Sequence, residues 1–359
     1  MRQQLVFPRH KVDLVDVTGI FHRQVLLHSF LLFTFLLTPI AAGAVDITEQ
    51  LHRPLNSSVG RQSRDEADSL LHIGEQQYAS GYANKTIASC LRALELYHSI
   101  GDLKAQGLTY NLLAKAYIQL GTFKEAEDAL RRALAIARDT KDFQSQIFVL
   151  NNITTFLLQQ GEFAAAGKTV QEALIIAQNV KNIEGQGLSL SNLGLVAARL
   201  GDYGKAIKLY ENALIFRRQT GNVIGEANTL NNLGDAYLAS GNYQDTIGTY
   251  GAAMRIAKIN RDRTNELRAI DGLVTAHSAV GRHERAFDLL EERLILAKEL
   301  QNVREELKSF ESYGQLYEQM GNYPTARNFY ERAIILARRL EDSKQEMLLL
   351  DKLTTMLKK

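Results

Sequence analysis

The sequence contains very few residues of the types that interrupt helices. Its 359 residues include only 4 prolines, and tryptophan is absent. Proline removes a backbone donor and clashes with the preceding turn of a helix, so this scarcity favours a chain that is helical almost throughout. The composition, with 45% hydrophobic and 23% charged residues, is typical of a folded protein and excludes disorder of the whole chain. We therefore expect an all-α fold.

Cysteine is nearly absent, and neither sign of charge is in large excess. The one cysteine, Cys90, excludes an intramolecular disulfide. The formal net charge is +2, and the residues after Ala44 carry 38 charged side chains of each sign. Binding to nucleic acid or to a membrane surface needs a basic field, so this balance supports neither partner.

Sequence motifs of catalysis are missing as well. The chain contains no G-x-S-x-G, Walker loop, G-x-G-x-x-G or H-E-x-x-H pattern. We therefore expect a protein that is not an enzyme and that has no cofactor, no catalytic residues and no metal site.

The first 44 residues have the pattern of an export signal. The apolar run VLLHSFLLFTFLLTPIAAGA extends from Val25 to Ala44 and contains the helix-breaking Pro39 ahead of an Ala-Gly-Ala tripeptide. This pattern predicts a secretory signal peptide over residues 1–44, and the alternative is an uncleaved membrane anchor. Cleavage implies a periplasmic or extracellular protein without direct membrane insertion. Residues 45–62 show no sustained periodicity and are expected to form a flexible leader.

Glycine recurs with a period of 40 residues. Each of these glycines follows apolar residues at helical spacing, where a residue in the left-handed conformation ends a helix. The series is Gly81, Gly121, Gly161, Gly201, Gly241, Gly281 and Gly321. A second series between them predicts helix N-caps at Asp102, Asp142, Asn182, Asn222, Asp262, Asn302 and Asp342. Residues 63–341 are therefore predicted to form seven helix hairpins.

The last segment, residues 342–359, is predicted to be a lone capping helix. An array of stacked hairpins leaves apolar surface uncovered at its final unit, which such a helix can cover. The side chains expected on its apolar face are Met347, Leu350, Leu353 and Leu357.

Packing positions also recur within the hairpins. In LSNLGLVAARLGDYGKAIKLYENALIF, residues 190–216, the Leu193-Gly194 pair is followed by Ala206, Tyr210 and Ala213. The pattern L-G-x-x-Y and then A-x-x-x-F/Y-x-x-A resembles the tetratricopeptide repeat over about residues 65–340. Its 40-residue unit is similar to the longer branch of that family, which includes kinesin light chains, Leu-Gly-Asn repeat adaptors and secreted cyanobacterial proteins.

The resemblance implies a right-handed α-solenoid whose concave wall is formed mainly by the first helix of each hairpin. In family members that bind extended peptides, asparagines before the Leu-Gly pair bond to the ligand backbone, which suits an amide that both donates and accepts. The alternative is that these asparagines tie neighbouring helices together or stay solvated. The predicted peptide-binding residues are Asn111, Lys115, Asn151, Asn152, Asn192, Arg199, Asn231, Asn232 and Asp235.

These expectations lead to a protein-binding scaffold outside the cytoplasm. It would hold an extended segment of a partner protein in its groove, in the assembly of a protein complex. The alternatives are a periplasmic photosystem-assembly or metal-delivery factor and a peptide-sensing regulator. The sequence does not predict the oligomeric state.

One hairpin departs from the pattern. Val274, Leu290 and Arg293 stand where other hairpins have glycine, tyrosine and alanine. These larger side chains are expected to widen or re-angle the local stack and to lower stability near residues 265–300.

Overall fold

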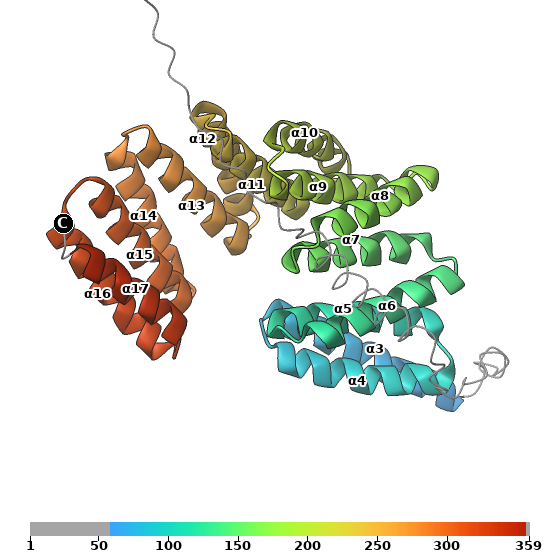
Figure 1. Ribbon diagram of the computed structural model, residues 1–359. Coiled ribbons are helices and arrows are strands. Elements are labelled where there is room, and N and C mark those ends of the chain that lie inside the picture. The colour runs from blue at the N-terminus through green and yellow to red at the C-terminus, as the bar shows by residue number, and fades with distance from the viewer. Residues whose placement is uncertain (1–57, 357–359) are drawn as a thin grey trace, which may run out of the picture. The chain divides into compact units, whose positions relative to one another are not determined.

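Helices account for all the regular structure in the part of the chain that the structure describes. It is a computed structural model, and it describes residues 58–356 (Figure 1). The predicted signal peptide and most of the predicted leader lie outside these residues. The 15 helices are α3 (Ser58–Ala79), α4 (Ala83–Ile100), α5 (Leu103–Leu120), α6 (Phe123–Asp139), α7 (Phe143–Gln159), α8 (Phe163–Asn179), α9 (Ile183–Arg199), α10 (Tyr203–Gln219), α11 (Val223–Ala239), α12 (Tyr243–Ile259), α13 (Arg263–Ala279), α14 (His283–Glu299), α15 (Val303–Gln319), α16 (Tyr323–Arg339) and α17 (Ser343–Met356).

Consecutive helices pair as hairpins, from α3 with α4 to α15 with α16, and α17 follows as a single helix. Each helix contacts the next along the chain, and the first helices of several neighbouring hairpins also touch, such as α7 with α9 and α11 with α13. The predicted all-α solenoid of seven hairpins is confirmed. Helix α3 begins at Ser58, so five residues that we assigned to the leader belong to the first hairpin.

Turn geometry follows the two residue series of the sequence. The seven glycines spaced 40 residues apart all have φ between 74° and 81°, the left-handed region that glycine enters without steric cost. The predicted N-caps also form. Asp102, for example, accepts a hydrogen bond from the amide of Ala105 at 3.0 Å, and the other six N-cap side chains make equivalent bonds.

The turns that join one hairpin to the next use a left-handed residue as well, and there glycine is not the rule. Only Gly101 and Gly221 supply it, with φ of 72° and 66°. The remaining five turns place a side chain in this region with φ between 51° and 55°: Lys141, Lys181, Arg261, Gln301 and Glu341. Their long polar side chains gave no signal of this conformation in the sequence.

In three of the seven hairpins a tyrosine ring from the second helix packs on a glycine of the first helix. A Cβ added at Gly194 would lie 2.7 Å from the ring of Tyr210, and one at Gly314 would lie 2.7 Å from the ring of Tyr330. Both tyrosines are at most 1% exposed. The Leu-Gly pair of the repeat therefore exists because the ring from the second helix needs the space above the glycine.

The divergent hairpin, α13 with α14, replaces this large-and-small pair by two residues of intermediate size. Leu290 is fully buried and Val274 is 8% exposed, and both belong to one core cluster that reaches from Ala197 to Leu316. The missing tyrosine ring thus makes room for the valine. Lower stability near residues 265–300 stays a prediction.

The packed face of the capping helix α17 differs from the predicted one. Leu349 is fully buried, Met356 is 7% exposed and Leu353 packs against the same cluster. Met347 and Leu350, which we expected to pack, are 67% and 41% exposed. That part of the prediction is wrong because the preceding hairpin covers a face of α17 turned away from these two side chains. Leu357 lies outside the described residues.

Candidate binding surface on the first helices of the hairpins

The predicted binding residues lie on the first helices of four consecutive hairpins, α5, α7, α9 and α11. Spacings of three and four residues place them on one side of each helix. Two periodic positions on this side of the first helices carry solvent-facing side chains. The first position holds Leu108, Phe148, Leu188, Asn228, Arg268 and Lys308, and the second, two turns further on, holds Lys115, Thr155, Leu195, Asp235, Thr275 and Gln315. These side chains, together with the asparagines between the two positions, are called the A-helix surface.

The polarity of the side chains changes along the A-helix surface. The first position is apolar on α5, α7 and α9 and polar or basic on α11, α13 and α15. Leu108 is 45% exposed, and Phe148 and Leu188 are half-buried. The three N-terminal members of the row therefore offer apolar contact area, and the three C-terminal members offer polar groups.

Asn151 is a structural tie between two hairpins. It is 1% exposed, and its Nδ2 donates to the Ile147 carbonyl at 2.8 Å and to the Ser189 hydroxyl at 2.9 Å. Its Oδ1 accepts from Nδ2 of Asn192 at 2.9 Å. Because every polar atom of this amide is engaged, Asn151 has no group left for a ligand.

Two predicted asparagines on α11 are also turned into the fold. Asn231 is fully buried, and its Nδ2 donates to the backbone oxygen and to Oδ1 of Asn265, both at 3.1 Å. Asn232 is 9% exposed, donates to Oδ1 of Asn228 at 3.3 Å and accepts from Nη2 of Arg268 at 2.6 Å. For these two residues and Asn151 the structure shows the tie between helices that we gave as the alternative.

The remaining asparagines keep free polar groups. Asn152 donates from Nδ2 to Oδ1 of Asn111 at 2.7 Å, which ties α7 to α5. The Oδ1 atoms of Asn152 and Asn192 accept no hydrogen bond from the described residues, and both side chains are half-buried rather than enclosed. Asn111, Asn152 and Asn192 therefore pair with the fold on one side and present amide atoms on the other.

The charged residues of the surface divide in the same way. Asp235 accepts from the hydroxyl of Tyr250 and from Nη2 of Arg268, so its carboxylate is already compensated. Lys115 is half-buried, and neither it nor Arg199 forms an ion pair or a side-chain hydrogen bond with the described residues. Burial lowers the pKa of Lys115, although the charge of Glu75 opposes this effect. The two predicted binding residues of α5 and α9 that form no ion pair with the described residues, Lys115 and Arg199, are thus both cations.

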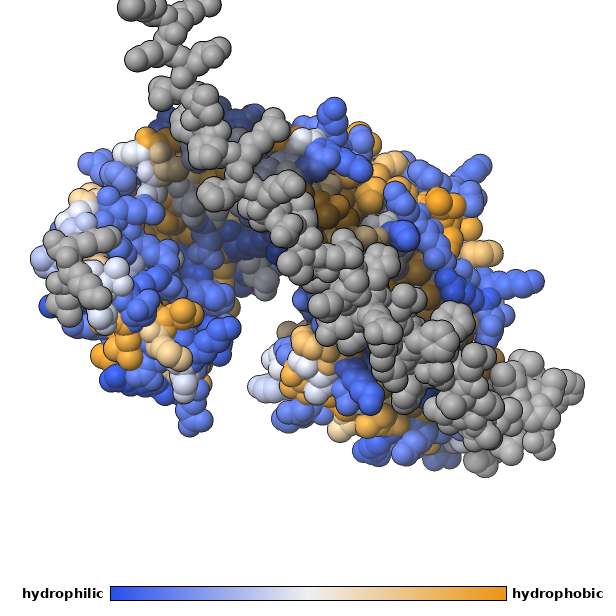
Figure 2. All heavy atoms as spheres, in the orientation of Figure 1, coloured by the Kyte–Doolittle hydropathy of each residue, from blue (hydrophilic) through white to orange (hydrophobic). Residues whose placement is uncertain are grey.

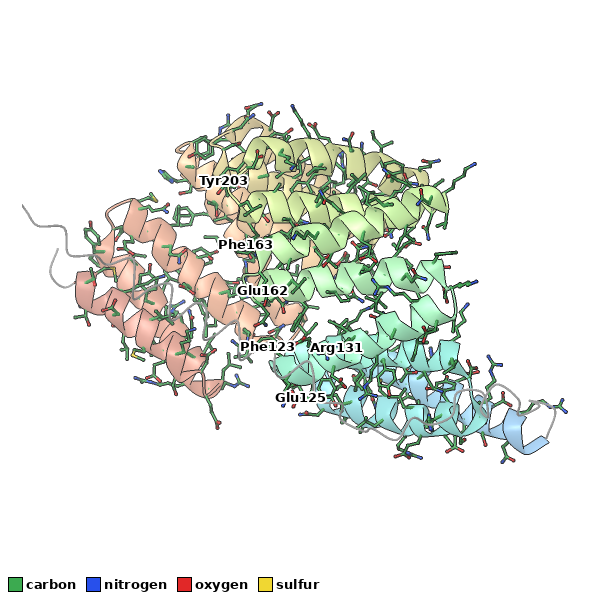
Figure 3. The ribbon with its side chains drawn as sticks, turned by 45° about the vertical axis from the view of Figure 1, so that its right-hand side comes forward. Phe123, Glu125, Arg131, Glu162, Phe163 and Tyr203 are labelled. Carbon is green, nitrogen blue, oxygen red and sulfur yellow. The ribbon has the colours of Figure 1, made fainter. Side chains whose placement is uncertain are left out.

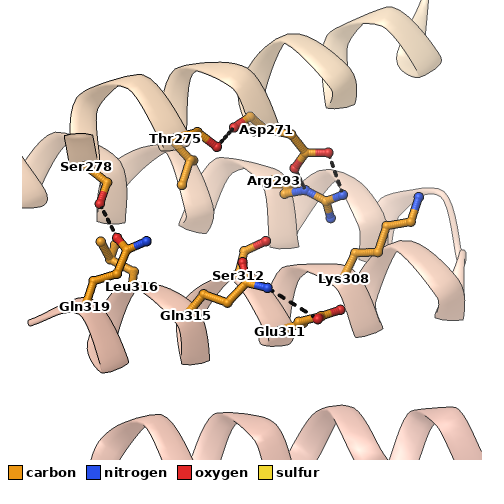
Figure 4. A pocket seen from close by; sticks show the side chains of 11 residues that line it. Asp271, Thr275, Ser278, Arg293, Lys308, Glu311, Ser312, Gln315, Leu316 and Gln319 are labelled. Atoms are coloured by element: carbon orange, nitrogen blue, oxygen red, sulfur yellow. Dashed lines mark hydrogen bonds and ion pairs between the residues drawn. The ribbon is translucent and has the colours of Figure 1, made fainter. Parts of the chain in front are cut away.

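A polar pocket of about 300 Å³ lies further along, between α13 and α15 (Figure 4). Its base holds Arg293, which is fully buried and pairs with Asp271 and with Oε2 of Glu305 at 2.9 Å. The same guanidinium donates to Oγ of Ser309 at 2.7 Å. Arg293 therefore clamps α14 to both neighbouring first helices. The sequence signals were an arginine at an alanine position and an aspartate at 271, but their pairing was not predicted.

A second unpredicted pocket, of about 480 Å³, is more apolar and lies between α6 and α7. Phe123 and Phe156 line it with ring centroids 6.3 Å apart, and Arg131 and Glu162 also line it. Figure 3 labels Phe123, Arg131 and Glu162. Phe123 begins α6, just as Phe163 begins α8 and Tyr203 begins α10. This pocket contains none of the predicted binding residues.

No group of three or more His, Cys, Asp or Glu side chains among residues 58–356 is placed to hold a metal ion. In the same range, no helix combines the length and the apolar character needed to cross a membrane.

Family models match most of the hairpins. Models of the tetratricopeptide repeat match residues 146–219 and 225–299, residues 108–140 and residues 310–344. Together these ranges cover more than half of the 359 residues. A comparison with the curated proteins gave no match.

Solved structures with the same fold are numerous but distant in sequence. The apo form of RapI is 14% identical with a TM-score of 0.58, over 77% of this chain and 99% of that one. A Rap protein complexed with Competence and Sporulation Factor is 13% identical with a TM-score of 0.54, over 82% and 98%. A signal transduction ATPase with a tetratricopeptide repeat sensor from Pyrococcus horikoshii is 17% identical with a TM-score of 0.59, over 79% of this chain and 44% of that one.

Repeats of this family typically bind segments of other proteins. The 40-residue hairpins, the Gly-Tyr packing between their helices and the matching models lead to one conclusion: the chain belongs to the tetratricopeptide repeat family.

Proposed function

We propose that the protein is a binding scaffold, rather than an enzyme, and that it holds an extended segment of a partner protein on the A-helix surface of α5, α7 and α9. One observation carries this proposal. On these three helices, free amide atoms, uncompensated cations and exposed apolar side chains occur together, whereas on α11, α13 and α15 most polar groups are already bonded within the fold.

Each of these groups suits one part of a peptide. The free Oδ1 atoms of Asn152 and Asn192 can accept from backbone amides, and apolar contacts can form on Phe148, Leu188 and Leu195. Lys115 and Arg199 form no ion pair with the described residues, although the charge of Glu75 acts on Lys115. They favour a segment with acidic side chains, because the half-buried Lys115 and the exposed Arg199 can each form a charge-assisted hydrogen bond with a carboxylate.

The test compares partner capture by three versions of the chain. In the first variant Asn152→Ala is combined with Asn192→Ala, and the control is Asn212→Ala, which removes an exposed amide from α10. Two lost hydrogen bonds correspond to about 1–3 kcal/mol, or about a 5- to 150-fold weaker complex. Capture that survives unchanged in the double variant, with helicity equal to wild type, would contradict the assignment of the surface.

We further propose that the protein acts outside the cytoplasm, in the assembly of a protein complex. The support is the apolar run from Val25 and the Ala-Gly-Ala tripeptide that ends at Ala44. N-terminal sequencing of protein isolated from its native host should find a chain that begins just after Ala44. A chain that retains residues 1–44 and stays in the cytoplasm would overturn this part of the proposal.

A further inference from the structure

The helix α17 (Ser343–Met356) stands at the position that the first helix of a hairpin has in the 40-residue repeat. Its N-cap, Asp342, stands 40 residues after Asn302, and its side chain accepts from the amide of Gln345 at 3.1 Å, as the other N-caps do. Residues of α17 can therefore be compared position by position with the first helices of the preceding hairpins.

Three positions of α17 match positions that contact neighbouring helices in the preceding hairpins. Position 347 corresponds to Gly107 and Gly187, and an added Cβ there would lie 3.1 Å from a side-chain carbon of the paired second helix in both cases. Position 344 corresponds to Lys104, whose ammonium lies 3.4 Å from the next N-cap, Asp142. Position 351 corresponds to Asn151, which bonds to the next first helix. Positions 344, 347 and 351 of α17 thus correspond to positions that contact neighbouring helices in the preceding hairpins, whereas position 348 corresponds to the solvent-facing Leu108, Phe148 and Leu188.

The exposed face of α17 that contains Lys344, Met347, Leu348 and Asp351 is apolar at its centre and charged at its ends. Met347 is 67% exposed and Leu348 is 52% exposed. An orange patch in Figure 2 lies over the first half of α17, the dark red helix of Figure 1. Lys344 and Asp351 are exposed, and neither forms an ion pair with the described residues. The four side chains follow the spacing i, i+3, i+4, i+7, which places them on one face of the helix.

The order of these residues makes the face complementary to itself. A twofold axis through the point between Met347 and Leu348 would bring each methionine against the leucine of the other copy. The same axis would place each lysine opposite the aspartate of the other copy, because both pairs are centred on the same point of the helix. Charges that lie seven residues apart, about 10 Å along the helix, would bracket the apolar contact at both ends.

We propose that the protein forms a symmetric dimer in which the α17 helices of two copies pack antiparallel through Met347 and Leu348, with Lys344 of each copy paired with Asp351 of the other. The apolar contact supplies affinity, and the two ion pairs fix the antiparallel direction. The proposal is independent of the binding surface on α5, α7 and α9.

The test is sedimentation equilibrium of the full chain over a concentration series. The wild type should approach twice the mass of one chain as concentration rises. Met347→Glu combined with Leu348→Glu should weaken association at least tenfold, because four buried carboxylates would face one another. Ile215→Glu, a control at a side chain that is 61% exposed on α10, should associate like the wild type. Circular dichroism should be the same for all variants, since the substituted side chains are exposed.

A charge exchange tests the direction of packing. Lys344→Glu alone and Asp351→Lys alone should each weaken association several-fold, since each places like charges together. The variant that carries both substitutions should recover the wild-type association to within about threefold, since the ion pairs are rebuilt in reverse. A wild type that stays monomeric would overturn the proposal. So would association that Met347→Glu combined with Leu348→Glu does not weaken, or a charge-exchange variant that does not recover association. Growth beyond the dimer would also overturn the proposal, since head-to-tail stacking does not close.

Discussion

Substitution of Gly234 by alanine tests how the hairpins are packed. This glycine lies in the interior of α11, under the ring of Tyr250 from α12. A Cβ at position 234 would lie 2.8 Å from the ring, and Gly272 closes the ring's other side so tightly that a Cβ there would overlap it. The tyrosine is 1% exposed, and its hydroxyl donates to Asp235, so the ring has little freedom to move away.

Two effects of opposite sign decide the outcome. Alanine has a higher helix propensity than glycine, which stabilises a helix interior by about 1 kcal/mol. Overpacking a filled core costs about 1–3 kcal/mol, and the upper part of this range applies when the neighbour is held on both sides. We therefore expect Gly234→Ala to lower the free energy of unfolding by up to about 2 kcal/mol.

The matched control lies in the same hairpin. Gly248 is exposed on α12, and a Cβ there would meet no atom within 4 Å. Only the propensity term remains, so Gly248→Ala should raise the free energy of unfolding by about 1 kcal/mol. Urea denaturation followed by circular dichroism measures both changes. If Gly234→Ala stabilises the protein as much as Gly248→Ala, the ring does not pack as described.

A second substitution checks the cause. Tyr250→Leu should relieve the overpacking of Gly234→Ala, because the chain itself combines a larger residue with leucine at Val274 and Leu290. In a double-mutant cycle the two changes should be coupled by at least about 1 kcal/mol. Strict additivity would show that the alanine acts through something other than this ring.

Three further predictions concern ionisable groups that are buried or half-buried. Arg293→Ala should destabilise the protein by about 3 kcal/mol, because Asp271 and Glu305 lose the partner that joins three helices. Amide hydrogen exchange should rise first in α13, α14 and α15. Unchanged protection of these helices would contradict the prediction. Burial disfavours the charged form of Glu305, but Lys308 and Arg293 outweigh this effect and hold the pKa of Glu305 below its usual value. The stability that Glu305 contributes is therefore complete above its unfolded pKa of about 4.3 and is lost as pH falls through its folded pKa. Glu305→Gln should reduce the loss of stability at acid pH, and an unchanged loss would refute the assignment. Burial, together with the charge of Glu75, raises the pKa of the Cys90 thiol to about 12. A thiol reagent at pH 8 should therefore label Cys90 only as fast as the protein opens. Rapid labelling of the native state would contradict the burial of Cys90.

Periodic features of the fold could be predicted from the sequence because they depend on short-range chemistry. The N-cap at Asp102 bonds to an amide three residues away, and Gly121 needs only its own left-handed backbone, so both series were found from spacing alone. Lys141 takes the same left-handed conformation without a residue type that reveals it. Hairpin number and register followed from the first two series.

The roles of the surface asparagines could not be predicted in the same way. Asn151 bonds to a hydroxyl 38 residues further along, and Asn232 accepts from an arginine 36 residues away. Their chemistry is the same as that of Asn152 and Asn192, whose amides keep free atoms. The positions of the neighbouring helices decide which asparagine amides bond within the fold. The spacing of residues in the sequence does not reveal these positions.

The same limit applies to Arg293 and to the capping helix. At an alanine position an arginine suggests disruption, yet two carboxylates from α13 and α15 meet it. In α17, apolar residues at three- and four-residue spacing lie on more than one face of the helix. The position of α16 decides which of these faces is buried.

Site-specific photo-crosslinking tests the central claim most directly. A photoreactive amino acid replaces Leu195, on the A-helix surface, or Ile215, which is 61% exposed on the second helix of the same hairpin. In the native host, the account predicts a crosslinked partner protein from position 195 and none from position 215. A partner crosslinked from position 215 and not from position 195 would contradict it.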